Sequence, residues 1–470
     1  MPQVAEYRGG FWLFLSEVAL AVLGAAYWFI LSRLVGATEL GTAAAVVSVG
    51  TVVAALTSLG VETGLFRHAG EMFKRGDKTS ASTYLWSSVV IRIPMLAMAV
   101  FIVTQLPTPD PLYSATLAVV VGLVGILNIY TTAMYRTEVR LVVNVVSSFV
   151  KIGVGVMLAG WGWLGVVISY ISGSIVSLVM FAGFVLRHVV FTKPRIGASI
   201  EVVKAGVPLW ASSASILTVD LTGILSVYVV TGAAETGVLY VAHVVSWLVT
   251  AAASISVGLL TPTLAAMDSG RREAAASACR LALALSAPLA AMLVAMPYVP
   301  LSLLGREFQA AALPLALMAA AAVPTVVLNV VNSYFLAEKR YKSLFLINFL
   351  RSVLQLVLYI FLIPLYGAVG VALSAFVTTL VFAAALSKFL DLGRLHLLAV
   401  AVPFAIAPVG LVLPWPLAAA AISASWLLYL RVGVLTRRDI SDLAHAILGK
   451  QADNIYRKYW YIIDKIIPER

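Results

Sequence analysis

The chain has 470 residues, of which 61% are hydrophobic and only 11% are charged, and its mean hydropathy is +1.00. Soluble domains carry about 25% charged residues, so this composition excludes a soluble enzyme and an intrinsically disordered chain. The net charge of +11 is interpreted first as a consequence of membrane topology, and no nucleic-acid partner is expected. The only cysteine, Cys279, excludes a disulfide framework and a cysteine-based metal site.

Apolar runs of about 20 residues, the length that crosses a bilayer, recur along the whole chain and predict about 14 transmembrane helices. In chain order the predicted spans are 11–34, 43–66, 83–105, 114–135, 141–160, 164–186, 206–230, 237–260, 279–304, 310–336, 344–365, 368–389, 395–413 and 416–434. The sequence therefore predicts an all-α, polytopic membrane protein.

Positively charged residues are distributed very unequally between the two sets of connecting loops. Apart from Arg92, Lys151 and Arg351 deep inside spans, only Arg33, at the end of the first span, and Arg306 lie on one side, and the other Lys and Arg residues lie on the second side and the two ends of the chain. Because basic loops stay on the cytoplasmic side, this pattern predicts a multi-pass protein of the cell (plasma) membrane with both termini in the cytoplasm.

The motifs of several enzyme classes are missing from the sequence. The connections on the predicted outer side, such as "GWG" and "LYG", are too short for an extracytoplasmic catalytic domain. The sequence has neither a GxxxxGK[ST] phosphate loop nor an HExxH zinc motif. We therefore expect no enzyme, no cofactor and no metal, and transport is the function that remains.

Short motifs recur in the same order in two halves of the chain. The segment 36–41, "GATELG", returns at 232–237 as "GAAETG". Pro94 and Pro288 occur at matching depths of the third and ninth spans. Before the sixth and twelfth spans, Gly162 matches Gly367 and Gly165 matches Gly370. Single matches of this kind arise by chance in Ala- and Gly-rich proteins, whereas three ordered matches favour an internal repeat.

The repeat predicts a domain organisation with two pseudo-symmetric six-helix lobes. Residues 1–196 form the N-terminal lobe, 197–391 form the C-terminal lobe, and 392–434 form a two-helix extension. Six is an even number, so both lobes would insert in the same orientation and could rock around a central cavity. Residues 435–470 predict a cytoplasmic amphipathic tail that lies on the anionic membrane surface or binds a partner protein.

Several stretches together resemble the polysaccharide and lipid-linked oligosaccharide flippases of the multidrug/oligosaccharidyl-lipid/polysaccharide (MOP) exporter superfamily. The stretches are "LSRLVGATELG" from Leu31, "SLGVETGLFRHAG" from Ser58, "AGVPLW" at 205–210, "DLTGILSVYVVTGAAETGVLYVA" from Asp220, "LLTPTLAAMDSGRREAA" from Leu259, "LLGREFQAAA" from Leu303 and "IPLYGAVGVALS" from Ile363. The resemblance covers about residues 1–390. It implies twelve to fourteen helices in two lobes, and movement of sugars linked to an undecaprenyl or dolichyl carrier. In the family pattern a basic residue often follows the acid of the seventh span, whereas Leu221 follows Asp220 here.

Five charged residues inside the predicted spans are the candidate functional residues. Arg92, Lys151 and Arg351 are predicted to bind substrate, because basic groups about 10 Å or more from the cytoplasmic end usually face a wet cavity or a partner. Asp220 and Glu17 are predicted to couple an ion or to form an ion pair. Internal pairing, such as Arg92 with Glu17 or Arg351 with Asp220, is the alternative to substrate binding.

Basic residues among the deepest charges favour an anionic substrate. The predicted function is a flippase that moves a polyprenyl- or dolichyl-phosphate-linked glycan to the outer leaflet by alternating access, for surface polysaccharide or glycoprotein assembly. Its partners would be membrane lipids and, in addition, glycosyltransferases or a polymerase. The alternatives are a cation-coupled multidrug antiporter of the same superfamily, a flippase for a peptidoglycan precursor, and a non-transporting scaffold of a glycan synthase.

Overall fold

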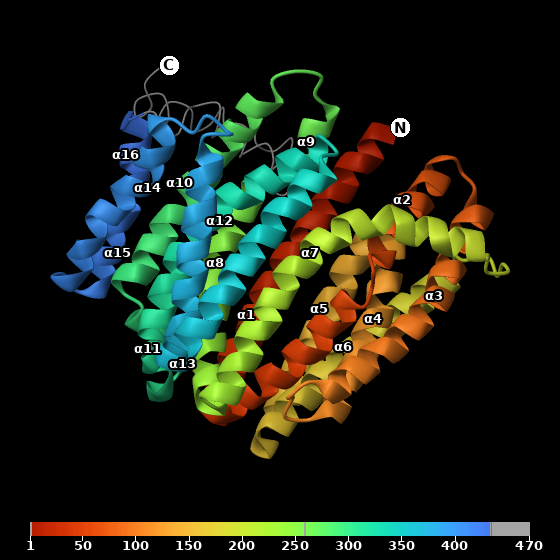
Figure 1. The fold of residues 1–470 in the computed structure, drawn as a ribbon, viewed down its shortest axis with the longest axis horizontal. Helices are drawn as coiled ribbons and strands as arrows, with labels where there is room; N and C mark the ends of the chain where they lie inside the picture. Colours follow the sequence, from red (N-terminus) through yellow and green to blue (C-terminus); the bar gives the residue numbers. More distant parts are fainter. Residues whose placement is uncertain (1, 258–259, 433, 435–470) are drawn as a thin grey trace. The chain divides into compact units, whose positions relative to one another are not determined.

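The structure, a computed structural model, describes residues 2–257, 260–432 and 434. All regular structure in this part of the chain is helical (Figure 1). The helices are α1 (Pro2–Leu56), α2 (Val61–Lys74), α3 (Lys78–Gln105), α4 (Pro111–Ala133), α5 (Thr137–Met157), η1 (Ala159–Trp161), α6 (Trp163–Leu186), α7 (Ile196–Val230), α8 (Ala233–Val257), α9 (Leu260–Ala266), α10 (Arg271–Ala295), α11 (Tyr298–Leu304), η2 (Arg306–Ala311), α12 (Ala312–Ala337), α13 (Tyr341–Ser387), α14 (Arg394–Ile406), η3 (Ala407–Leu411), α15 (Trp415–Ser423) and α16 (Ser425–Val432).

Eleven helices of the described residues are long and apolar enough to cross a membrane, which confirms a polytopic all-α protein. Two of them, α1 and α13, each cover all or most of two consecutive predicted spans and change direction at a glycine between the spans. Gly36 (φ 78°) and Gly367 (φ 51°) adopt backbone angles that residues with a Cβ disfavour. A further apolar helix over Arg394–Gly410 is shorter and coincides with the predicted span 395–413.

Two predicted span boundaries are wrong. The second span was expected to end at residue 66, but α1 ends at Leu56 and α2 begins only at Val61. Leu59 (φ 47°) and Gly60 (φ 76°) in the intervening turn have left-handed backbone angles, which end a helix. The ninth span was expected at 279–304, but α10 ends at Ala295, because proline at 297 disfavours helix geometry in the residue before it.

The chain divides into two compact units, the first of which comprises Met1–Val241, Leu304–Phe308 and Tyr341–Val371. In this unit α5 packs against α1 and α6, and α4 packs against α1, α3 and α6, so that α3 to α6 lie side by side (Figure 1). Helix α2 packs against α3, α4 and α7 around buried apolar side chains such as Leu65, Ile126 and Val202. All five candidate residues lie in this first unit.

The second unit comprises Ala242–Leu303, Gln309–Arg340 and the described residues from Ala372 onward. Its centre is α10, which packs against α12 and α14. The indole Nε1 of Trp426 in α16 donates to the carbonyl oxygen of Ala284 in α10 (3.0 Å), and an ion pair joins Arg271 to Glu338 (2.7 Å). The two C-terminal predicted spans therefore pack on the predicted ninth span.

The two copies of the repeated motif contact each other inside the first unit. A Cβ added to Gly41 would collide with the carbonyl oxygen of Ala233, and one added to Gly237 would collide with the carbonyl oxygen of Ala37. Residues 37 and 41 correspond to 233 and 237 in the repeat, so the contact is reciprocal, as around a local two-fold axis. This reciprocity supports the predicted relation between residues 1–196 and 197–391, which stays a prediction.

The glutamates of the two motifs have equivalent roles as helix caps. Glu39 Oε2 accepts from the backbone N–H of Trp163 (2.6 Å), and Glu235 Oε1 accepts from that of Ala368 (2.8 Å). Each acceptor serves the first turn of a helix that follows a positive-φ glycine, Gly162 or Gly367. These N–H groups have no partner within their own helix, so the carboxylates stabilise the two helix starts.

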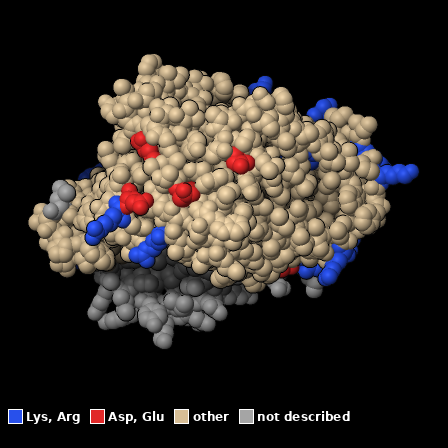
Figure 2. Space-filling model, turned by 90° about the horizontal axis from the view of Figure 1, so that it is seen from below, with Lys and Arg blue, Asp and Glu red and all other residues tan. Residues whose placement is uncertain are grey.

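The outer surface of the bundle is apolar, as expected for side chains that face lipid. Phe101 of α3, Phe149 of α5 and Phe361 of α13 are among the strongly exposed large side chains. On the face that Figure 2 shows, most of the surface belongs to uncharged residues, with a small number of acidic and basic side chains among them. The low charged fraction of the sequence thus corresponds to an exterior on which large apolar side chains are exposed.

Candidate functional site

The five predicted site residues lie in four separate polar clusters of the first unit. The clusters are the Arg92 pair with Glu62, the Lys151 site, the site where the charges of Asp220 and Arg351 interact, and the Glu17 pair with Arg140. The structure therefore does not bring Arg92, Lys151 and Arg351 together into one cation cluster, and each is best understood from its own neighbours.

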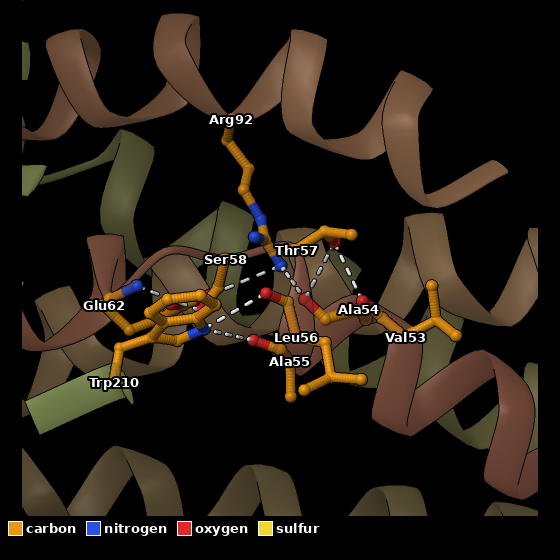
Figure 3. A network of polar contacts seen from close by, with 10 residues as sticks. Val53, Ala54, Ala55, Leu56, Thr57, Ser58, Glu62, Arg92 and Trp210 are labelled. Atoms are coloured by element: carbon orange, nitrogen blue, oxygen red, sulfur yellow. Dashed lines mark hydrogen bonds and ion pairs between the residues drawn. The ribbon is translucent and has the colours of Figure 1, made fainter. Parts of the chain in front are cut away.

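Arg92 on α3 is packed inside the protein, with 1% of its side chain exposed. Its Nη2 donates to the carbonyl oxygen of Ala54 (2.8 Å) and lies 3.5 Å from Glu62 Oε1 on α2 (Figure 3). The sequence suggested Glu17 as an internal partner of Arg92, which is wrong, because Glu17 is paired with Arg140. A buried guanidinium requires a nearby anion, and the first turn of α2 provides it.

Two glycines of α4 make room for this ion pair. A Cβ at Gly122 would lie 2.9 Å from Arg92 Nη2, and a Cβ at Gly125 would lie 3.3 Å from Glu62 Oε1. Residues three apart lie on the same side of a helix, so both glycines present bare backbone to the pair. The GxxG spacing in "VVGLVGIL" is the sequence signal that could have indicated a close neighbour of α4.

The C-terminal end of α1 is capped from two other helices. Its last carbonyl groups lack partners within the helix, and Arg92 bonds to that of Ala54. Trp210 of α7 donates from Nε1 to the carbonyl oxygens of Ala55 (3.3 Å) and Leu56 (3.1 Å), as Figure 3 shows. The backbones of Gly60 and Gly206 also touch, since a Cβ on either would collide with the other. The sequence carried no signal for this role of Trp210.

Lys151 on α5 lies between two aromatic rings. Its Nζ is 4.6 Å from the ring centroid of Tyr27 and 4.6 Å from that of Tyr170. The fully buried Tyr27 is held in place because its hydroxyl donates to the carbonyl oxygen of Val166 (3.0 Å) and bonds with Ser169 Oγ (2.8 Å). Ring faces attract a cation but do not neutralise it.

The ammonium of Lys151 has no counter-ion among the residues that the structure describes. Neither a hydrogen-bond acceptor nor a carboxylate of this part of the chain lies within bonding distance of Nζ. The residue as a whole is only partly buried. A charged group at this depth is costly unless water or an anion reaches it.

Asp220 on α7 and Arg351 on α13 form the third cluster. Their charges interact, and the hydroxyl of the buried Tyr359 lies near both and accepts from Gln355 Nε2 (3.0 Å). Asp220 is exposed, although it lies well inside a membrane-spanning helix. Their charges are thus close enough to interact, and the internal pairing of Arg351 with Asp220 stays a prediction.

Glu17 on α1 is paired with Arg140 on α5, and neither was expected to meet the other. Next to this pair, Asn144 Nδ2 donates to Ser16 Oγ (3.0 Å). The described residues contain no group of three or more His, Cys, Asp or Glu side chains that could hold a metal ion, and Cys279 is fully buried.

Solved structures of membrane transporters have the same fold. A lipid II flippase, MurJ, in an inward closed conformation matches with a TM-score of 0.71 and 14% identity, over 89% of this chain and 98% of that chain. An inward-facing multidrug resistance MATE family transporter of the MOP superfamily matches with a TM-score of 0.57 and 13% identity, over 79% and 94%. A MOP superfamily transporter from Pyrococcus furiosus matches with a TM-score of 0.52 and 15% identity, over 83% and 96%.

At these identities the likeness shows the fold, and the sequence family supplies the second finding. No curated protein matches the chain. The family described as polysaccharide biosynthesis protein matches residues 30–312, which is more than half of the chain. The resemblance noted from the motifs between Leu31 and Ile363 is confirmed by this match and by the shared fold. The chain belongs to the polysaccharide biosynthesis protein family and has the fold of MOP superfamily transporters.

Proposed function

We propose that the protein is a flippase that moves a polyprenyl-phosphate- or polyprenyl-diphosphate-linked oligosaccharide from the cytoplasmic to the outer leaflet of the cell membrane. The observation that carries the proposal is Lys151, an ammonium between two tyrosine rings without a carboxylate mate among the described residues. A phosphate group is the anion that would complete this site, because an ammonium binds it as a compact point charge.

The energetic obstacle to flipping is the polar glycan. Each hydroxyl moved into hydrocarbon without a hydrogen-bond partner costs several kcal/mol, about 4 to 8 kcal/mol on alkane scales. A water-filled passage between two lobes of six helices removes that cost, while the polyprenyl chain stays in lipid. An inside-negative membrane potential assists the outward movement of an anion by about 2.3 kcal/mol per charge per 100 mV.

A cation-coupled multidrug antiporter is the second candidate, and Asp220 is the observation that favours it. An exposed carboxylate inside a membrane-spanning helix is a suitable site for a proton or a cation. However, Arg351 supplies a positive charge beside it, which weakens cation binding there. The two candidates therefore assign the essential charge to different residues, Lys151 or Asp220.

Reconstituted protein tests the proposal directly. Liposomes would contain the full chain and a fluorescent polyprenyl-diphosphate-linked oligosaccharide, and a membrane-impermeant quencher would report how fast the label reaches the outer leaflet. We expect Lys151→Gln to slow this movement about tenfold or more, since one charge-assisted bond to phosphate is lost. Lys151→Arg keeps the charge between the two rings and retains part of the activity.

A matched charge control separates a local effect from a change of net charge. Lys342 lies at the exposed start of α13. The variant Lys342→Gln loses the same charge as Lys151→Gln and should leave the flipping rate unchanged. Normal flipping by Lys151→Gln, with wild-type melting temperature, would refute the flippase assignment of this site. Export of cationic drugs that is lost in Asp220→Asn but retained in Lys151→Gln would establish the antiporter instead.

A further inference from the structure

Helix α5 has two opposite faces of different chemistry. Arg140, Asn144, Ser147 and Lys151 recur at intervals of four, three and four residues, and so lie along one side of the helix. Val142, Val146, Phe149 and Val156 recur in the same way about half a turn away, and all four are strongly exposed. The apolar side faces the exterior, and the polar side faces α1 and α6, the helices against which α5 packs.

The polar face reaches from the cytoplasmic end predicted for α5 to Lys151. Arg140 lies one turn inside the helix, and Lys151 lies eleven residues further, about 16 Å along the axis. Between them, Asn144 bonds with Ser16 of α1, and Ser147 Oγ donates to the carbonyl oxygen of Asn144 (3.2 Å). Polar groups thus continue along the helix from one cation to the other.

The two cations differ in how they are neutralised. Among the described residues, Lys151 has two ring faces and no carboxylate beside it, whereas Arg140 is paired with Glu17 of α1. This pair is asymmetric, since the side chain of Arg140 is 18% exposed and that of Glu17 is 54% exposed. The Nε of Arg140 is buried without a hydrogen-bond partner among the described residues. Glu17 is therefore a solvent-exposed counter-ion on a cation that has unused donor capacity.

We infer that the polar face of α5 is the binding path of the anionic head group, with Arg140 as its outer cation and Glu17 as a counter-ion that the phosphate displaces. This inference rests on the proposed function and extends it to residues beyond Lys151. A phosphate that arrives at Arg140 replaces the carboxylate, because it offers more acceptor oxygens to the planar guanidinium. It then moves along Asn144 and Ser147 to Lys151.

Binding of inorganic pyrophosphate to the purified full-length protein tests the two roles. Removal of the charge of Arg140 should lower the affinity, whereas removal of the charge of Glu17 should raise it. Arg140→Gln loses a charge-assisted bond, so binding should weaken and the dissociation constant should rise about tenfold. Glu17→Gln removes a competing anion and should tighten binding by up to about fivefold. If the ion pair only stabilises the packing of α1 against α5, both variants should lose the same amount of stability and bind pyrophosphate as the wild type does. That result would overturn the inference.

The pair of Arg136 and Glu138 at the start of the same helix is the matched control. Their side chains are 3.2 Å apart and exposed, Arg136 precedes the first residue of α5, and Glu138 points away from the polar face. Arg136→Gln and Glu138→Gln should change pyrophosphate binding little, which excludes a general effect of net charge. If Lys151→Gln stops flipping while the Glu17 and Arg140 variants bind as the wild type does, the proposed function stands and the path on α5 is refuted. If the wild type does not flip the lipid, the proposed function itself fails.

Discussion

Three basic side chains in the first unit illustrate how differently a membrane protein accommodates a positive charge. Arg92 has a carboxylate and a carbonyl oxygen, Arg351 has the nearby charge of Asp220, and Lys151 has two tyrosine rings. Pairing with a carboxylate stabilises a charge within the protein, and Arg92 has such a partner in Glu62. Lys151 retains the capacity to attract an external anion.

At this scale the Arg92 and Glu62 pair gives an asymmetric prediction for stability. Glu62→Gln leaves the guanidinium of Arg92, 1% exposed, without an anion and should cost about 3 kcal/mol of the free energy of unfolding. Arg92→Met should cost less, since Glu62 is 25% exposed and can be hydrated. The double variant Arg92→Met with Glu62→Leu should recover part of the loss. Thermal unfolding in detergent measures all three, and equal losses for both single variants would contradict this description.

Close approach of backbones determines how the elements fit together. Gly41 and Gly237 join the two repeated motifs, and Gly60 and Gly206 join the turn after α1 to α7. In each contact a Cβ would collide with a main-chain atom of the other helix, which cannot rotate away as a side chain can. These glycines thus specify which helices meet, whereas the apolar residues around them only require burial.

Gly206→Ala should therefore destabilise the protein, by about 2 kcal/mol as an overpacked contact, even though alanine favours helix. Gly70→Ala in α2 is the control, because a Cβ there would meet no atom within 4 Å. That variant should be neutral or more stable by up to about 1 kcal/mol. Unfolding temperatures in detergent compare the two. Similar shifts in both variants would show that α7 does not need the close contact.

For the whole molecule, the unequal distribution of Lys and Arg is the main evidence on orientation. Basic residues gather at the ends of the helices on one predicted side, and only Arg33 and Arg306 lie on the other. Movement of a lipid-linked glycan outward requires the cation path of α5 to begin in the cytoplasm. Orientation is therefore a condition for the proposed direction of transport.

Single cysteines report this orientation in intact cells. Cys279 is fully buried and can be replaced by alanine, after which Gln3→Cys or Glu469→Cys supplies the only thiol. We expect a membrane-impermeant maleimide to label neither terminus until the membrane is permeabilised. Gly160→Cys, in the predicted outer connection after α5, should be labelled at once. Labelling of either terminus from outside would reverse the predicted topology.

The sequence by itself determined the all-helical polytopic class, most span positions and the family, because hydropathy, span length and short motifs are local properties of the chain. The bends in α1 and α13 occur at Gly36 and Gly367, which lie between consecutive predicted spans. Only the tertiary structure decided which charges are paired. Glu62 rather than Glu17 meets Arg92, Glu17 meets Arg140, and Tyr27 meets Lys151 across more than a hundred residues. The side chains around a charge come from helices far apart in sequence, so packing alone separates a structural cation from one that remains available to a ligand.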